Sequence, residues 1–395
     1  MDDTDSLGGG CTTEVLFRLL QQLPKQVTIG TKRLVRLWPF ARRRTRGNAA
    51  VAVELNVKNE QVLLEFLEQF WDKEILPHKG NKHESNHSER EQFPADPGMV
   101  WFSEIKRNEQ LYKSGLRREL TLKDLPVSTK AWGGHGKIGA TLAVVWPAND
   151  VTYEAIAWRT KKNAEIRKVD NHAREVVEAM DETFLCRDER LGKSMLAPRG
   201  ASPVLFGIRA WSKRAAKQAL QVLVDAPNTE SVAGSMVFET NQATNDHLDD
   251  SMTIEVESIE VLRGGHTVLQ SQNDRFLAFK ESGELARICQ CLRPGDIIEC
   301  KGLRAPDHSI HIEFLKINHL VAERTRPKCP HCNKALSSMG RNQGLRCKKC
   351  GLKQEDSWIQ NQRSLPLNTW IQPPPSARRH LAKPLLEDSI RQNNL

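Results

Sequence analysis

The apolar residues of this chain change their spacing several times, and each change predicts a different kind of element. From Thr12 to Leu23 they recur every three or four positions, which predicts an amphipathic helix. Two more helices are expected, one with an apolar face between residues 166 and 180 and a basic one from Lys213 to Val224. Short apolar runs predict strands at 49–57, 151–158 and 203–211.

Residues 250–322 alternate between apolar and polar side chains with a period of two. Gly, Pro and Asp turns separate three strand-like segments, 253–262, 295–302 and 310–317. Short strands without helices between them favour a small barrel such as an OB fold, and a plain β-meander is the alternative. Aromatic residues that could stack on bases are few in this region: Phe276, Phe279 and Phe314. We therefore expect it to bind nucleic acid mainly through charge.

These changes of pattern divide the chain into regions 1–150, 151–248, 249–325, 326–355 and 356–395. A length of 395 residues allows several domains, each with its own core, and the mixture predicts an α+β multidomain protein. The longest apolar stretch, Ile138 to Trp146, is far shorter than the roughly 20 residues that span a bilayer. The acidic start does not resemble a signal peptide. We therefore expect a cytoplasmic protein that does not interact with a membrane.

The basic residues are clustered along the sequence, which a globular protein without a charged partner does not require. The net charge is +9, and one short segment holds Lys32, Arg33, Arg36, Arg42, Arg43, Arg44 and Arg46. Such a cluster favours a polyanionic partner, and a solvated basic surface is the alternative. We expect Arg43, Arg44 and Arg46 to contact RNA.

Four of the nine cysteines form two CxxC pairs, Cys329 with Cys332 and Cys347 with Cys350. Four thiolates in two tight turns are typical of a structural zinc site with no open coordination position. Flanking basic residues, including Lys348 and Lys349, indicate that this zinc ribbon contacts nucleic acid.

The chain opens with MDDTDSLGGGCTT, which combines carboxylates with a glycine loop before a helix. Asp2, Asp3 and Asp5 could hold Mg²⁺, while Gly8, Gly9 and Gly10 could place backbone N–H groups around a phosphate. Thr12 offers a hydroxyl at the helix start. A frayed terminus is the alternative. The turn 133–140 is a second candidate phosphate loop, in which Lys137 could neutralise charge.

Several motifs, in this order, resemble the archaeal 2-agmatinylcytidine synthetases that modify the minor isoleucine tRNA (the TiaS family). The match covers essentially the whole chain, and its most specific parts are the DDTD–CTT opening and the proline-rich tail. The segments that carry the resemblance are DDTDS–GGCTT, TRGN (45–48), DPG (96–98), GKIGA (136–140), PRG–PVLFGIR (198–209), FETNQATNDH (238–247), CPHC–CKKCG and PPPSARRHLAKPL (373–385).

The resemblance implies a ligase that uses ATP, Mg²⁺ and a structural Zn²⁺. Its expected substrates are agmatine and the minor isoleucine tRNA with a CAU anticodon. The wobble cytidine would be phosphorylated at its C2 oxygen, and agmatine's amine would displace that phosphate, while ATP ends as AMP and phosphate. The anticodon would then read AUA in place of AUG. The implied folds are a kinase-like catalytic domain (1–150), a ferredoxin-like domain (151–248), an OB fold (249–325) and the zinc ribbon (326–355).

By position, the resemblance also implies roles for individual residues. Asp2, Asp3 and Asp5 match the carboxylates that handle metal and ATP, and Thr12 matches a threonine that becomes phosphorylated. The nucleotide-facing loop and the segment that handles agmatine correspond to Lys137, Gly139, Pro203, Gly207 and Arg209.

Two departures from the family pattern are visible. Family members begin with a short apolar strand before the two aspartates, whereas Met1 directly precedes Asp2 here. We therefore expect either a start codon assigned too late or a chain that lacks the strand anchoring its phosphate loop and is inactive as written. In addition, Ala243 stands where the family has glycine, which predicts a less tightly formed turn.

Two other functions are compatible with the motifs. A non-catalytic RNA-binding protein would use the barrel and the ribbon, but it would have no need of magnesium-binding carboxylates beside a phosphate loop. A third possibility keeps the ATP site and couples a different amine to RNA.

Overall fold

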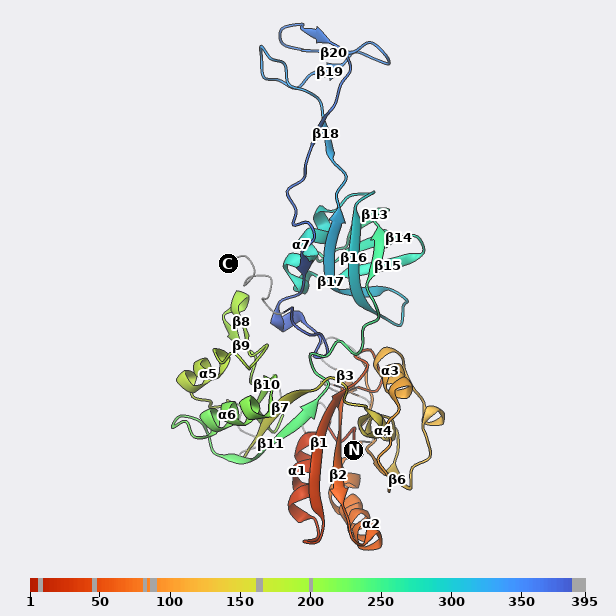
Figure 1. The fold of residues 1–395 in the computed structure, drawn as a ribbon, viewed down its shortest axis with the longest axis vertical. Coiled ribbons are helices and arrows are strands. Elements are labelled where there is room, and N and C mark those ends of the chain that lie inside the picture. Colours follow the sequence, from red (N-terminus) through yellow and green to blue (C-terminus); the bar gives the residue numbers. More distant parts are fainter. Residues whose placement is uncertain are drawn as a thin grey trace. The chain divides into compact units, whose positions relative to one another are not determined.

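The computed structural model describes residues 1–5, 10–44, 48–80, 84–85, 91–160, 166–198 and 202–385. The chain is a mixed α+β protein that forms two compact units (Figure 1). The first unit comprises residues 1–249 together with the chain from Pro374 onward, and the second comprises Asp250–Pro373. The carboxy-terminal segment therefore packs with the amino-terminal half of the sequence.

The first unit is built on one five-stranded sheet. Its order is β10 (Val204–Ala210), β7 (Thr152–Arg159), β11 (Val232–Thr240), β1 (Thr28–Arg36) and β2 (Ala49–Asn56). All neighbouring strands are antiparallel except β1 and β11, which run parallel with Arg33 opposite Glu239 and Leu34 opposite Thr240. Strands from both sides of residue 150 thus share one sheet, and the parallel pair joins them.

Helices cover both faces of this sheet, because successive strand residues point to opposite sides. Leu34 and Trp158 pack with α1 (Thr12–Gln22) and α2 (Glu60–Phe70). On the other face, Val35 packs with α3 (Glu109–Arg117) and α4 (Lys137–Val145), and Ala157 packs with α6 (Lys213–Val224) and α5 (Asn171–Glu178). Short strand pairs complete the unit: β3 (Glu84–Ser85) with β4 (Glu91–Gln92), β5 (Gly98–Trp101) with β6 (Lys130–Gly133), and β8 (Arg187–Asp188) with β9 (Lys193–Ser194).

Most of the elements predicted for this unit are present. The predicted helix Thr12–Leu23 corresponds to α1, and the helix predicted from Lys213 to Val224 is α6. The helix expected between 166 and 180 is shorter than predicted. Ile166 lies before its start and is 77% exposed, and Val176 is 41% exposed. Asp170 sets this start, since its side chain accepts a hydrogen bond from the Ala173 N–H.

The strand β1 was not predicted, since it runs through the basic cluster. Its Arg33 is buried and not a surface residue: its guanidinium donates to Trp146 O at 3.1 Å and to Glu54 Oε1 at 3.1 Å. Part of the positive charge that indicated a polyanion-binding surface therefore serves the interior of this unit.

The second unit contains a six-stranded path in the order β12 (Met252–Glu255), β16 (Ile297–Arg304), β17 (Ile310–His319), β15 (Asp274–Ala278), β14 (Thr267–Ser271) and β13 (Ser258–Val261). Since two residues separate β12 from β13, the two ends of the path belong to one continuous segment. The predicted strand 253–262 is thus two strands. Helix α7 (Glu284–Cys291), which was not predicted, contributes Leu285 to the core, where Phe276 is also buried.

The remaining strands of this unit are short. The cysteine-containing segment forms a three-stranded sheet of β19 (Ser337–Ser338), β20 (Leu345–Arg346) and β21 (Lys353–Gln354). Beside it in the sequence, β18 (Glu323–Thr325) pairs with β22 (Ile359–Asn361), and β23 (Trp370–Ile371) pairs with β17. Across the described ranges, no helix has the length and apolar character that crossing a membrane requires.

Candidate active site

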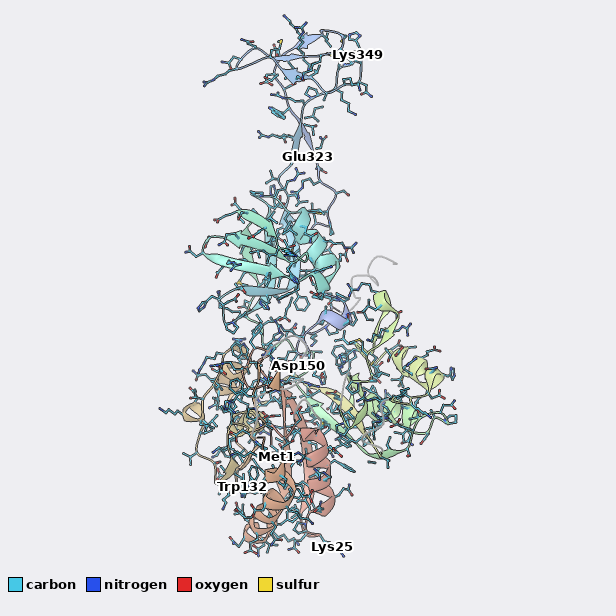
Figure 2. All side chains as sticks on the ribbon, turned by 180° about the vertical axis from the view of Figure 1, so that it is seen from behind. Met1, Lys25, Trp132, Asp150, Glu323 and Lys349 are labelled. Carbon is cyan, nitrogen blue, oxygen red and sulfur yellow. The ribbon has the colours of Figure 1, made fainter. Side chains whose placement is uncertain are left out.

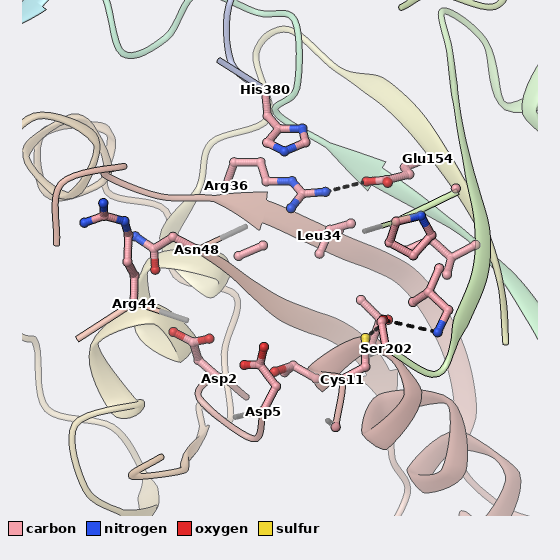
Figure 3. A pocket seen from close by; sticks show the side chains of 18 of the residues that line it. Asp2, Asp5, Cys11, Leu34, Arg36, Arg44, Asn48, Glu154, Ser202 and His380 are labelled. Atoms are coloured by element: carbon pink, nitrogen blue, oxygen red, sulfur yellow. Dashed lines mark hydrogen bonds and ion pairs between the residues drawn. The ribbon is translucent and has the colours of Figure 1, made fainter. Parts of the chain in front are cut away.

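A cavity of about 580 Å³ lies in the first unit, where five separate parts of the sequence meet (Figure 3). The amino-terminal segment and the start of α1 line one side, with Asp2, Asp5 and Cys11. Arg36 and Glu154 from the sheet line the other side, together with His380 from the carboxy-terminal segment. The volume falls within the usual range for sites that bind small molecules and cofactors.

The amino-terminal segment is held by backbone hydrogen bonds on both sides. Val51 N donates to Met1 O at 3.0 Å, and Asp2 exchanges two backbone hydrogen bonds with Gly98, at 3.0 and 3.1 Å. Asp3 then adopts a left-handed conformation with φ of 60°, which is uncommon for a residue other than glycine. Its Oδ2 accepts a hydrogen bond from Asp96 N at 2.9 Å. The first three residues are therefore well anchored within this fold.

The carboxyl groups of this segment stand in an unfavourable environment for negative charge. Burial, together with the neighbouring carboxylate of Asp3, raises the pKa of Asp2 well above its usual range. Burial also raises the pKa of Asp3 to about 7, and Asp5 and Asp96 add to the shift. Crowded, buried carboxylates of this kind would be stabilised by a cation. Within the described residues, however, the set of three or more metal-ligand atoms that lie close together is the cysteine cluster and not these aspartates.

The start of α1 presents backbone N–H groups without a side-chain cap. Its N-cap residue, Cys11, is extended and makes no capping hydrogen bond through its side chain. Thr12 is buried, lines the cavity, and its Oγ1 accepts a hydrogen bond from Thr4 Oγ1 at 3.1 Å. Thr13 Oγ1 accepts one from Trp158 Nε1 at 3.2 Å. A helix start of this kind is suited to an anion, since its N–H groups and its dipole both favour negative charge.

Of the three predicted loop glycines, Gly8 and Gly9 lie outside the described residues. Gly10 lines the cavity with a φ of 83°. A Cβ at this position would lie 2.9 Å from Thr4 O, so both the conformation and the close approach require glycine.

The second glycine-rich turn packs its backbone against the aspartates. A Cβ added at Gly139 would lie 1.9 Å from Asp2 Oδ2, and His135 N donates to Asp96 Oδ2 at 2.7 Å. Gly139 lines a smaller cavity of about 50 Å³ next to Asp2 and Asp3. Lys137 lines neither of the two cavities. The turn thus positions the acidic segment, and a contact of Lys137 with a nucleotide stays a prediction.

The opposite wall contains a hydrogen-bonded chain of side chains that sequence analysis missed. Arg36 Nη2 donates to Glu154 Oε2 at 3.0 Å (dashed in Figure 3), and Gln242 Nε2 donates to the same oxygen. Gln242 Oε1 lies 3.1 Å from His380 Nδ1. The nearby charge of Arg36, followed by burial and Arg209, keeps the pKa of His380 well below its usual range. His380 is therefore neutral at physiological pH.

Some of the residues predicted to bind agmatine and RNA line the cavity, and others do not. Gly207 and Arg209 line it, whereas Pro203 supports the neighbouring strand through its carbonyl, which accepts a hydrogen bond from Arg159 N at 2.8 Å. Arg43 and Arg44 line the cavity on the side of the aspartates. The remaining member of the predicted RNA-binding trio, Arg46, lies outside the described residues.

The carboxy-terminal motif 373–385 docks on the motif 238–247. Ala243 N donates to His380 O at 2.9 Å, and Asn245 N donates to Leu381 O at 2.9 Å. Lys383 Nζ forms an ion pair with Asp150 Oδ2 at 2.9 Å. This docking brings His380 into the cavity. His380 and the motif 238–247 are far apart in the sequence, so no periodic pattern of residues could have predicted their contact.

We expect Ala243→Gly to stabilise the protein by about 0.5–1 kcal/mol. Ala243 is fully buried with a φ of 54°, and a left-handed conformation costs a non-glycine residue about 1–2 kcal/mol, which exceeds the added chain entropy of glycine. Chemical denaturation measures the difference. Ala226→Gly, in a connection without positive φ, is the control and should destabilise. Equal destabilisation by both changes would contradict the account.

The cysteine cluster has the geometry of a metal site. The four Sγ atoms of Cys329, Cys332, Cys347 and Cys350 lie within 4.8 Å of one another, and those of Cys329 and Cys350 are 3.5 Å apart. Zinc with four thiolates at about 2.3 Å requires sulfur–sulfur distances of about 3.8 Å, so the residues fit Zn²⁺. Beyond two of these cysteines, the core of this segment is formed by Leu336 and Leu345.

The basic residues of the ribbon are exposed. Lys348 and Lys349 lie between the cysteines of the second pair and have exposed side chains (Figure 2, where Lys349 is labelled). A segment with so small an apolar core depends on the metal for its folding. Because their side chains are exposed, Lys348 and Lys349 are accessible to a polyanion.

The fold and the cavity define a multidomain α+β protein with a highly charged ligand site and a metal-binding ribbon. Three family models match it: the TiaS TCKD domain over residues 1–135, the TiaS FLD domain over 134–247 and the TiaS C-terminal zinc ribbon domain over 326–364. This chain belongs to the TiaS family, whose curated members are named as 2-agmatinylcytidine synthetases of an isoleucine tRNA.

Individual relatives match over nearly their whole length. The protein from Methanopyrus kandleri is 31% identical, over 97% of this chain and 95% of that protein. The protein from Ignisphaera aggregans is 29% identical, over 98% and 91%. A crystal structure of TiaS in complex with its isoleucine tRNA and ATP is 26% identical with a TM-score of 0.80, covering 97% of this chain and 95% of that one. An apo TiaS structure, also 26% identical, gives a TM-score of 0.77.

Proposed function

We propose that this protein is an ATP-dependent ligase that joins agmatine to C2 of the wobble cytidine of the minor isoleucine tRNA, whose anticodon is CAU. The observation that carries the proposal is the shared cavity, which is lined by Asp2, Asp3 and Asp5, by the start of α1 and by β10. A reaction that combines a nucleotide, an RNA base and a diamine requires one space in which all three can be oriented.

We infer a fold for each of the first four of the five predicted regions. A kinase-like fold for residues 1–150 rests on the family resemblance. The order β7, α5, β10, α6 and β11 supports a ferredoxin-like arrangement for residues 151–248. The path β12-β16-β17-β15-β14-β13, whose two end strands are consecutive in the sequence, supports an OB fold for residues 249–325. The ribbon would use Zn²⁺ for structure alone, since four cysteines leave no open coordination position.

The nucleotide would bind at the acidic side of the cavity. Asp2, Asp3 and Asp5 would hold Mg²⁺, which when bound neutralises charge on the phosphates. The N–H groups at the start of α1 would donate to phosphate oxygens, supported by the unfilled cap at Cys11. Thr12, whose hydroxyl lies at that point, would be the residue that receives a phosphoryl group. Gly8, Gly9, Gly10, Lys137 and Gly139 remain predicted nucleotide contacts.

Agmatine would bind along the segment that contains Pro203, Gly207 and Arg209. Glu154 is the acidic residue that we propose for its guanidinium. Oε2 of Glu154 is already bound by Arg36 and Gln242, while a Cβ added at Gly207 would lie 3.0 Å from Oε1. The absence of a side chain at Gly207 therefore leaves Oε1 approachable.

The chemistry follows in two steps. The C2 oxygen of cytidine would attack the γ-phosphorus of ATP, the bond to the β-phosphate would break and ADP would leave, and hydrolysis of its remaining anhydride bond by water would give AMP and phosphate. The transfer is needed because a carbonyl oxygen is a poor leaving group until it is phosphorylated. The primary amine of agmatine then forms a bond to C2, the C2–O bond breaks, and phosphate leaves with that oxygen while the amine loses a proton. Donors fixed in the cavity would stabilise the charge of the transferring phosphoryl group.

The proposal is tested by incubating the protein with ATP, labelled agmatine and an unmodified minor isoleucine tRNA transcript. We expect the label to enter the tRNA only when ATP is present, and not to enter a transcript whose anticodon is changed to GAU. Binding of tRNA without incorporation of agmatine would favour a non-catalytic RNA-binding protein instead.

We expect Glu154→Gln to raise the KM for agmatine about 10- to 100-fold, because a hydrogen bond between charged groups contributes about 1.5–3 kcal/mol. The KM for ATP should change little, and steady-state kinetics with each substrate varied in turn measures both. Glu175→Gln, at an exposed position of α5, is the matched control. Equal changes in both KM values would argue against a specific role in agmatine binding.

A further inference from the structure

The wall of the cavity that faces the aspartates carries an excess of positive charge. Arg36, Glu154 and His380 lie on this wall, across the cavity from Asp2 and Asp5 (Figure 3). Arg209, from the neighbouring strand β10, lines the same cavity. Two guanidinium groups therefore stand against one carboxylate, and His380 is neutral, which leaves one net positive charge.

The carboxylate on this wall belongs to Arg36 and not to Arg209. Arg36 Nη2 and Glu154 Oε2 form an ion pair at 3.0 Å, and both side chains are largely buried, with exposed fractions of 13% and 9%. Gln242 Nε2 donates to the same oxygen of Glu154. The charge of Glu154 is thus engaged by a partner and a second donor.

Arg209 is different, since its guanidinium forms no hydrogen bond or ion pair with any part of the chain that the structure describes. Burial lowers the pKa of this side chain, and the attraction of Glu154 only partly opposes that effect. The Arg209 side chain is half-buried, and a charge with limited access to water and no partner is favourably paired with an ion of opposite sign. The five N–H donors of arginine match the oxygens of a phosphate group particularly well.

His380 adds a second group suited to the same ligand. Its Nδ1 faces Gln242 Oε1, an atom that can only accept, so the proton of the neutral ring is on Nδ1 and Nε2 carries a lone pair. The residue keeps an exposed surface in the cavity. An arriving anion would favour protonation of Nε2, which would then donate a hydrogen bond to it.

We propose that Arg209 and His380 form a phosphate-binding subsite, separate from the acidic segment that would hold the nucleotide, and that this subsite receives a phosphoryl group of the RNA substrate. The proposal rests on the proposed function and makes it more specific. The phosphate could be a backbone phosphate beside the wobble cytidine or the phosphoryl group on its C2 oxygen. In both cases it balances the charge of a neighbouring agmatine guanidinium at Glu154.

The test compares Arg209→Gln with Arg214→Gln, a matched loss of charge at an exposed position of α6. Two titrations are made on the full-length protein: tRNA binding, and inhibition of the ATP-dependent reaction by inorganic phosphate. We expect Arg209→Gln to lose about 10- to 100-fold in at least one of them, and Arg214→Gln to remain within about twofold of the unchanged protein. Arg209→Lys, which keeps the charge, should recover part of the loss.

The two sources of phosphate give different results. If the subsite holds a backbone phosphate, methylphosphonate linkages beside the wobble nucleotide weaken tRNA binding to the unchanged protein but not further to Arg209→Gln. If it holds the transferred group, tRNA binding is unaltered, while inorganic phosphate inhibits the unchanged protein much more strongly than Arg209→Gln.

The proposal is overturned if Arg209→Gln and Arg214→Gln behave alike in both titrations. Should Arg209→Gln fail to fold, the methylphosphonate and phosphate titrations on the unchanged protein decide, and insensitivity to both would overturn the proposal. A protein that incorporates no agmatine would refute the proposed function instead, and the tRNA titration with methylphosphonate linkages would still report on the subsite.

Discussion

Replacing Asp3 by asparagine is expected to lower ATP-dependent incorporation of agmatine by at least about 10²- to 10³-fold, the usual cost of removing one group that stabilises charge in a transition state. Asp3 lines the cavity, and its carboxylate is anchored by Asp96 N at 2.9 Å. Thr12→Ala should have a comparable effect, since it removes the hydroxyl at the start of α1. Affinity for tRNA should stay within a few-fold in both variants.

The same Asp3→Asn change is expected to make the protein more stable at pH 8 in the absence of magnesium. Burial raises the pKa of Asp3 from 3.8 to about 7. The stability due to its protonation is therefore fully present below pH 3.8 and is lost as the pH rises through 7. Asparagine resembles the protonated form, so this loss disappears. The melting temperature should rise by about 2–4 °C for each kcal/mol of repulsion removed.

If Asp3→Asn lowers the activity but raises the stability, the Asp3 carboxylate serves function and not folding. Asp72→Asn, at an exposed position, is the control and should change neither quantity. A fall in melting temperature together with activity would assign Asp3 a role in folding, and a matching loss of tRNA affinity would exclude a dedicated role in phosphoryl transfer.

The second large effect is expected in the ribbon, where Cys347→Ser should release zinc and unfold residues 326–355. Structural zinc in small domains contributes about 10–16 kcal/mol, far more than two buried leucines can supply. We expect tRNA affinity to fall at least about tenfold, because the lysines at 348 and 349 are then no longer held in place. Metal analysis and a tRNA titration at fixed salt measure the two consequences.

Cys291→Ser, at an exposed cysteine outside the metal cluster, is the control and should retain both zinc and tRNA affinity. Loss of zinc without any loss of tRNA affinity would remove the ribbon from RNA recognition. It would leave the catalytic proposal intact, since the cavity belongs to the other unit.

Helices α1 and α6, each with one apolar face, were among the elements that sequence analysis predicted correctly. Helix α6 begins where Ser212 accepts a hydrogen bond from Ala215 N, a local signal that does not depend on the rest of the fold. Strand β1 was missed because Arg33 and Arg36 occupy positions where apolar residues are expected. Their charges are compensated by Glu54, which is 21 residues from Arg33, and by Glu154, which is 118 residues from Arg36. No local pattern reports such a pairing.

Some residues of the candidate site could be predicted from the sequence, and others could not. Asp2, Asp3, Asp5 and Thr12 could be predicted because carboxylates, glycines and a helix start follow one another within a few residues. Glu154 and His380 could not, since strand pairing brings the first into the cavity and the docking of the carboxy-terminal segment brings the second. The proline-rich tail and the motif 238–247 were visible as unusual segments, but their contact is a tertiary feature.

The most direct test of the account follows the oxygen atom at C2 of the wobble cytidine. A minor isoleucine tRNA labelled with ¹⁸O at that position is incubated with the protein, ATP and agmatine, and the released phosphate is analysed by mass spectrometry. If the cavity activates this oxygen by phosphorylation before agmatine displaces it, the inorganic phosphate carries the label. Agmatine incorporation with unlabelled phosphate would contradict the account.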